Sequence, residues 1–85
     1  MGLREERQKA KISQRVLAER SGVHIRMVQY YEQGRKNINN AKPISIYNLA
    51  NALNVPAYKI VTDEELIRAM KKERRKVKNA KSKRY

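Results

Sequence analysis

Apolar residues recur along most of the chain at the three- and four-residue spacing that is typical of amphipathic helices. The clearest stripe consists of Ile46, Leu49, Ala50 and Leu53, which share one face of a helix expected over residues 43–53. No segment alternates apolar and polar residues as a half-buried strand would. The pattern therefore predicts an all-α fold.

Residues that start and stop helices divide this pattern into short segments. Ser13 suits an N-cap, and Pro43 suits the first position of a helix. Gly22 suits a tight turn, and Gly34 suits the left-handed residue that ends a helix. Helices are thus expected over residues 3–10, 14–20, 24–33, 43–53, 56–61 and from 63 onward, with a polar loop over 35–42.

These helices are too short to be stable alone, so their apolar stripes must pack together. The neighbouring Tyr30 and Tyr31 point about 100° apart on one helix, so only one of them can face the core. We expect Tyr31 to pack inward and Tyr30 to face outward. The residues expected inside in the first half of the chain are Leu17, Ala18, Val23, Val28 and Tyr31.

The net charge of the chain indicates what kind of molecule it binds. The 85 residues include 21 Lys or Arg and 8 Asp or Glu, for a formal net charge of +13, which indicates a polyanionic partner. Residues 66–85 alone contain ten Lys or Arg and one Glu, so they carry +9 of this charge. We expect this basic extension to act as a non-specific electrostatic arm toward phosphates.

The start of the last helix has its own sequence pattern. Thr62 and Glu65 have the spacing of a capping box. Leu66, Ile67 and Met70 follow as a short apolar patch, which predicts that the first two turns of this helix dock on the core. Beyond these turns the extension has few apolar residues and is expected to be partly helical or disordered.

Several classes of function are disfavoured by composition. The chain has no Cys and a single His, and it shows no apolar run of membrane-spanning length and no secretory signal. No nucleophile–base pair or metal-ligand cluster is visible, so His24 is read as a surface residue. We therefore expect no cofactor, no metal, no membrane partner and no enzymatic activity.

The run QRVLAERSGVHIRMVQYYEQG, residues 14–34, resembles the helix-turn-helix of the Cro/repressor (XRE-like) family. SIYNLANALNVPAYKI resembles the fourth helix of that family and the entry to its fifth, so that the resemblance covers about residues 3–61. It implies a five-helix, lambda-repressor-like DNA-binding domain over residues 1–65, followed by a basic extension over 66–85. The matching positions are Gln14, Ala18, Gly22, Val23, Val28, Tyr31, Glu32 and Gly34.

The resemblance assigns roles to particular side chains. The recognition helix, about 24–33, would enter the major groove of double-stranded DNA, and the base-reading positions would be Ile25, Arg26, Gln29 and Tyr30. Arg26 suits guanine, Gln29 suits adenine and Ile25 suits a thymine methyl group. The residues expected at the DNA backbone are Gln14, Arg15, His24, Gln33, Arg35, Lys36 and Asn37.

Family members also pair two charged residues that match Arg7 and Glu32, so an internal ion pair is expected between the first and third helices. The sequence departs from the family pattern at two places. Glu6 stands where an apolar residue is usual, which predicts weak docking or a shifted register of the first helix. The loop over residues 35–42 is also longer than its common form.

Two functions remain open. The first is a sequence-specific transcriptional regulator of bacterial or phage type, expected to be a repressor and a homodimer that works in the cytoplasm at the nucleoid. Its dimer surface would lie around Ala57, Tyr58, Ile60, Val61 and Leu66. The second is an antitoxin or adaptor whose main partner is another protein, such as a toxin or the transcription machinery. A basic extension poor in apolar residues favours the first, because segments that neutralise toxins are usually apolar.

Overall fold

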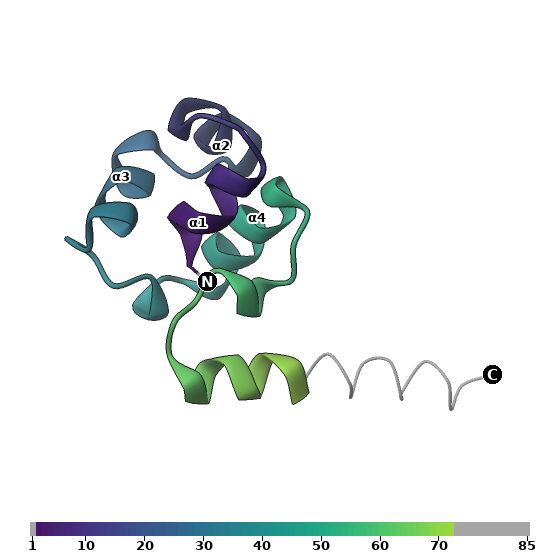
Figure 1. Ribbon diagram of the computed structural model, residues 1–85. Helices are drawn as coiled ribbons and strands as arrows, with labels where there is room; N and C mark the ends of the chain where they lie inside the picture. Colours follow the sequence, from purple (N-terminus) through teal and green to yellow (C-terminus); the bar gives the residue numbers. More distant parts are fainter. Residues whose placement is uncertain (1, 73–85) are drawn as a thin grey trace.

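The computed structural model describes residues 2–72, and every regular element in that range is helical (Figure 1). The elements are α1 (Leu3–Lys9), α2 (Gln14–Ser21), α3 (Ile25–Gln33), the 3-10 turn η1 (Ile38–Asn40), α4 (Pro43–Leu53) and the 3-10 turn η2 (Ala57–Lys59). A C-terminal helix then begins at residue 64 and continues to residue 72, where the description ends. The predicted all-α, five-helix architecture is confirmed.

Local sequence rules set most of the helix ends. The Ser13 Oγ accepts a hydrogen bond from the backbone N–H of Val16 at 3.1 Å, so Ser13 is the predicted N-cap of α2. Gly22 and Gly34 end α2 and α3 in the left-handed conformation, at φ of 74° and 77°. Pro43 opens α4 as predicted, and α3 starts one residue late, with His24 as its cap.

The core lies where α1, α2, α3 and α4 meet, with α4 against α2 and η2 (Figure 1). The apolar stripe of α4 is buried as predicted. Ala18, Val23 and Tyr31 are partly buried and pack against this core. The buried apolar side chains are Leu3, Leu17, Val28, Ile38, Ile46, Leu49, Ala50, Leu53, Ala57, Ile60 and Val61.

This core corrects the predicted dimer surface. Ile60 and Val61 are fully buried within one chain, and Ala57 is only 8 % exposed. They are unavailable to a second chain, because their side chains already pack against α4 and its neighbours. The large hydrophobic side chains that stay exposed, among the described residues, are instead Ile44 and Tyr47 on α4.

Two helix predictions near the C-terminus were wrong. The segment 56–61 forms only the 3-10 turn η2, because Ile60 and Val61 turn into the core instead of continuing a helix. The capping box at Thr62 does not form either. Asp63 caps the C-terminal helix, and its Oδ1 accepts from the backbone N–H groups of Glu65 at 2.9 Å and Leu66 at 3.1 Å.

The C-terminal helix docks on the domain as the sequence predicted. Leu66, Ile67 and Met70 are partly buried and pack against the core cluster. In Figure 1 this helix lies to one side of the group formed by α1 to α4. The predictions for the rest of the basic extension, residues 73–85, lie outside the described residues.

The polar loop over residues 35–42 contains a buried anchor that the sequence pattern did not reveal. Ile38, at the start of η1, is only 8 % exposed and belongs to the core cluster. Asn37 caps this turn, and its Oδ1 accepts from the backbone N–H of Asn39 at 2.9 Å. The long loop is therefore held to the core near its middle.

The first prediction compares two isoleucines close in sequence. Ile38→Ala should destabilise the protein by about 2–5 kcal/mol, because it removes core packing and leaves a cavity. Ile44→Ala makes the same chemical change at a side chain that is 64 % exposed, and at a protein concentration low enough to keep the chain monomeric it should stay within about 0.5 kcal/mol of wild type. Urea denaturation of the two variants measures both values. Equal losses would mean that the loop is not anchored through Ile38.

Candidate nucleic-acid interface

The outward face of α3 gathers four of the predicted DNA contacts. At 100° per residue, Arg26, Gln29, Tyr30 and Gln33 fall within an arc of about 100° on the side opposite Val28. Arg26 and Gln33 are exposed, Gln29 and Tyr30 are partly exposed, and Val28 is fully buried. These side chains offer guanidinium, amide and phenol groups, which form the hydrogen bonds used at base edges and phosphates.

The first turn of α3 presents two more predicted contacts. The His24 Nδ1 accepts a hydrogen bond from the backbone N–H of Arg26 at 3.1 Å, so His24 is both exposed and the helix N-cap. A neutral imidazole in this cap carries its proton on Nε2, which leaves an outward donor. Ile25 lines a shallow groove between α2 and α3 together with Arg15 and Ala18. This apolar position fits the contact with a methyl group that the sequence assigned to Ile25.

The two adjacent tyrosines point in different directions, as predicted. Tyr31 packs against the core cluster, whereas Tyr30 lies outside that cluster and is partly exposed. The guanidinium carbon of Arg35 lies 5.9 Å from the centroid of the Tyr30 ring, within the range of a cation–π contact. The backbone N–H of Arg35 also donates to the carbonyl of Tyr30 at 2.9 Å. The loop after α3 is thus folded back beside the outward face of α3.

The predicted ion pair between α1 and α3 forms with two parallel hydrogen bonds. The Nε of Arg7 lies 2.7 Å from Glu32 Oε2, and the Nη2 of Arg7 lies 2.9 Å from Glu32 Oε1. The Glu32 side chain is only 3 % exposed, and that of Arg7 is 14 % exposed. The hydrogen bond to Glu32 raises the pKa of Arg7 above its ordinary value, although burial acts in the opposite direction.

The same carboxylate holds Gln14, the first residue of α2. Gln14 Nε2 donates to Glu32 Oε1 at 3.2 Å, while Arg7 Nη1 donates to the carbonyl of Ile12 at 2.9 Å. One buried group therefore joins α1, the α1–α2 connection, the start of α2 and the last turn of α3. The contact of Gln14 with the DNA backbone stays a prediction.

Glu6 does not weaken the docking of α1, so this expectation was wrong. Glu6 is buried at 6 % exposure, on the same helix as the buried Leu3. The ion pair between Arg7 and Glu32 shows that α1 has the expected register against α3. Lys9 Nζ lies 3.4 Å from Glu6 Oε2 and supplies a positive partner one turn later. The Glu6 carboxylate is tolerated at this position because residues three apart on α1 are neighbours, which brings it next to Lys9.

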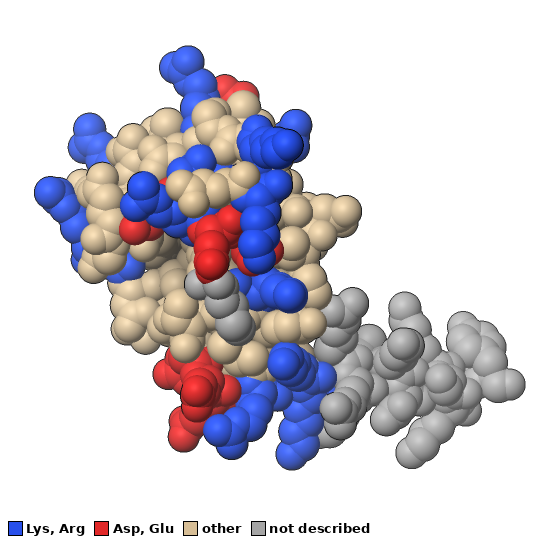
Figure 2. All heavy atoms as spheres, viewed as in Figure 1, with Lys and Arg blue, Asp and Glu red and all other residues tan. Residues whose placement is uncertain are grey.

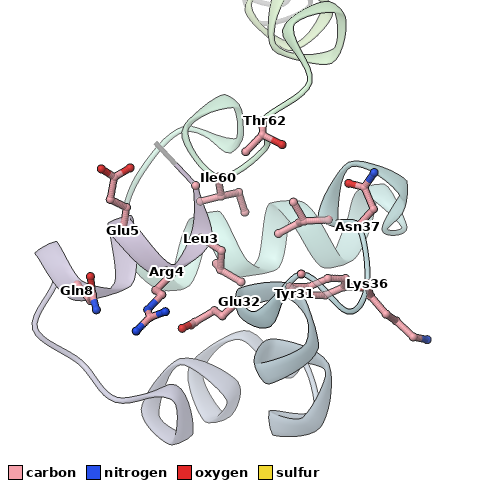
Figure 3. A pocket seen from close by; sticks show the side chains of 13 residues that line it. Leu3, Arg4, Glu5, Gln8, Tyr31, Glu32, Lys36, Asn37, Ile60 and Thr62 are labelled. Carbon is pink, nitrogen blue, oxygen red and sulfur yellow. The ribbon is translucent and has the colours of Figure 1, made fainter.

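The loop after α3 presents the remaining predicted backbone contacts. Arg35, Lys36 and Asn37 are all exposed. Lys36 and Asn37 line an open cleft of about 580 Å³ between α1, the end of α3 and this loop, and Lys36 extends away from it (Figure 3). No role for Asn39 was predicted, yet its side-chain amide donates to both Asn37 and Thr62. The only sequence feature pointing to such a role is the spacing of three asparagines around a single Ile.

Positive charge covers much of the face seen in Figure 2, over α1 to α3. Three exposed acidic residues gather at the start of the C-terminal helix, at Asp63, Glu64 and Glu65, and two more, Glu5 and Glu19, lie on α1 and α2. Within residues 2–72 no group of three or more His, Asp or Glu side chains could hold a metal ion. None of the helices in that range is long and apolar enough to cross a membrane.

A helix-turn-helix family model matches residues 3–60, which is about two thirds of the chain. The chain belongs to the helix-turn-helix family. The Cro/repressor (XRE-like) resemblance of the sequence is thereby confirmed, and with it a function as a DNA-binding regulator. Neither the curated proteins nor the solved structures that were searched gave a significant match.

Family membership identifies the recognition helix of this structure. In a helix-turn-helix protein the second helix of the motif lies in the major groove, and α3 is that helix here. Its outward face, its first turn and the loop that follows it carry all the predicted contact residues except Gln14 and Arg15, which lie at the start of α2. The individual roles of these side chains at bases or phosphates stay predictions.

The second prediction concerns the buried ion pair. Glu32→Ala should destabilise the protein by about 3–5 kcal/mol, because it leaves the Arg7 guanidinium buried without its partner. Glu19→Ala changes the net charge equally, but Glu19 is exposed on α2, so we expect a change within about 0.5 kcal/mol. Thermal or urea unfolding measures both. Small, equal changes would show that the pair does not hold α1 to α3.

Proposed function

We propose that this helix-turn-helix protein is a sequence-specific transcriptional regulator that binds double-stranded DNA as a homodimer and acts as a repressor. The domain would comprise residues 1–65, and the basic extension, residues 66–85, would add non-specific contacts to phosphates. A protein seated in the major groove of an operator excludes other proteins from that site, so repression needs no further contact. Such a protein would work in the cytoplasm, at the nucleoid of a bacterium or phage host.

The observation that carries this proposal is the outward face of α3. Arg26 and Gln29 share this face with Tyr30, and side chains on the outward face of a recognition helix would meet base edges. Two exposed cations, Arg35 and Lys36, follow directly in the loop and suit the adjacent phosphates. Base reading and backbone contact would thus come from one continuous surface.

The alternative is an antitoxin or adaptor whose main partner is another protein. This reading would need an apolar surface as its principal feature. The described residues expose large hydrophobic side chains only at Ile44 and Tyr47, whereas cations and amides dominate the surface around α3. The distribution of charge therefore favours DNA as the main partner.

A homodimer contact through α4 accounts for the two exposed hydrophobic side chains. None of the 11 residues of α4 is charged, although the chain carries a net charge of +13. Ile44 is 64 % exposed and Tyr47 is 40 % exposed. Two copies of a strongly cationic chain repel each other least where their facing surfaces are neutral, so α4 is the helix we propose at the two-fold axis.

The third prediction tests the function directly. Selection of bound sequences from random duplex DNA should give a two-fold symmetric motif whose half-sites are centred about one helical turn apart. Tyr47→Glu should lower the affinity for the full two-fold site and leave binding to a single half-site nearly unchanged. Recovery of no preferred sequence would contradict a specific regulator, and a single asymmetric site would contradict the dimer.

The fourth prediction concerns Arg26. If Arg26 forms two hydrogen bonds with a guanine, Arg26→Ala should cost about 1–3 kcal/mol on the selected site and relax the preference at one base pair. Arg20→Ala removes the same charge from an exposed position near the end of α2 and should leave that preference unchanged. Equal weakening by Arg26→Ala on every sequence would mean that Arg26 touches only phosphate.

A further inference from the structure

Asn39 joins the loop after α3 to the start of the C-terminal helix. Its Oδ1 accepts hydrogen bonds from the backbone N–H groups of Thr62 at 2.9 Å and Asp63 at 3.0 Å. Its Nδ2 donates to the Oδ1 of Asn37 at 2.9 Å and to the Oγ1 of Thr62 at 3.0 Å. All four hydrogen-bonding positions of this amide are therefore occupied, three of them by partners that lie 23 or 24 residues away in the sequence.

This geometry fixes the orientation of two amides. A backbone N–H can only donate, so the atom of Asn39 that faces Thr62 and Asp63 must be the oxygen. The Nδ2 of Asn39 must then face Asn37, which presents its own oxygen in return. The backbone N–H of Asn39 donates to that same oxygen at 2.9 Å. Consequently the Nδ2 group of Asn37 is turned away from η1, and it has no acceptor within residues 2–72.

Asn37 lies in the segment that the proposed function places at the DNA backbone. It is exposed and directly follows Lys36 in the sequence. Asn37 and Thr62, the two side chains that Asn39 bonds, line the same cleft (Figure 3). An outward amide donor beside a lysine is the arrangement that suits a phosphate oxygen.

We infer that Asn39 is a positioning residue for DNA binding, which acts by holding the Asn37 amide outward as a donor to a phosphate. The inference deepens the proposed function and rests on it. Asn39 itself touches no DNA, because its donors and acceptors are used inside the protein. Ile38 anchors the loop to the core from the neighbouring position, so the length added to this loop serves to fix the direction of one side chain.

A double-mutant cycle between Asn37 and Asn39 tests this role. Asn39→Ala should weaken binding to the selected duplex by about threefold to tenfold, the usual worth of one hydrogen bond. In an Asn37→Ala background the same substitution should cost less than about twofold, because the donor that Asn39 positions is already absent. The cycle separates positioning from mere stability, since a structural role would weaken both backgrounds equally.

Two controls make the test specific. Asn40→Ala changes the neighbouring exposed asparagine, whose side chain makes no hydrogen bond with any described residue, and should leave the affinity within about twofold of wild type. Thr62→Val removes one of the four hydrogen bonds of Asn39 and should cause a smaller loss of DNA affinity. That loss should also disappear in the Asn37→Ala background. Circular dichroism establishes that each variant is folded at the temperature of the binding measurement. If Asn39→Ala does not fold, the Thr62→Val cycle decides.

The outcomes distinguish this inference from the proposed function. If the wild-type protein binds no duplex with preference, the proposed function fails and the inference fails with it. If the wild-type and Asn40→Ala proteins bind alike, but Asn39→Ala has no effect or is additive with Asn37→Ala, then only the inference is overturned. Loss of affinity that disappears in the Asn37→Ala background supports it.

Discussion

The contact surface depends on the buried carboxylate of Glu32. It accepts two hydrogen bonds from Arg7 and one from Gln14, and so connects three helices at a single point. Short helices have little stability of their own, and their relative orientation comes from contacts of this kind. Because Glu32 lies about 120° around α3 from the exposed Arg26, the pair also sets the direction in which α3 presents its outward face.

The chain meets the demands of a cationic DNA-binding surface by separating its charges. Its buried acids, Glu6 and Glu32, each have a positive partner, and three of its five exposed acids within residues 2–72, Asp63 to Glu65, gather at the C-terminal helix. The outward face of α3 and the loop after it are thus left to cations, amides and one tyrosine ring. This arrangement favours a polyanion at α3, since little negative charge lies there to oppose it.

The long loop after α3 shows how a departure from a family pattern can be accommodated. A polar stretch of this length would be costly to order by itself. One apolar residue, Ile38, and one fully bonded amide, Asn39, hold it at both the core and the C-terminal helix. The backbone-contact segment therefore has a defined position beside α3, and part of that position comes from residues far along the chain.

The sequence by itself determined most of the helices, most of their caps and the face of α3 that points outward. These features depend on residues within about four positions of each other, a range that helical periodicity and capping rules cover. The family resemblance supplied the pair between Arg7 and Glu32, which are 25 residues apart. Only the tertiary structure decided that Asp63 caps the C-terminal helix. The hydroxyl of Thr62, the predicted cap, instead accepts a hydrogen bond from Asn39, which lies 23 residues earlier in the chain. It likewise decided the burial of Ile38, since a lone apolar residue in a polar loop has no periodicity from which its direction can be inferred.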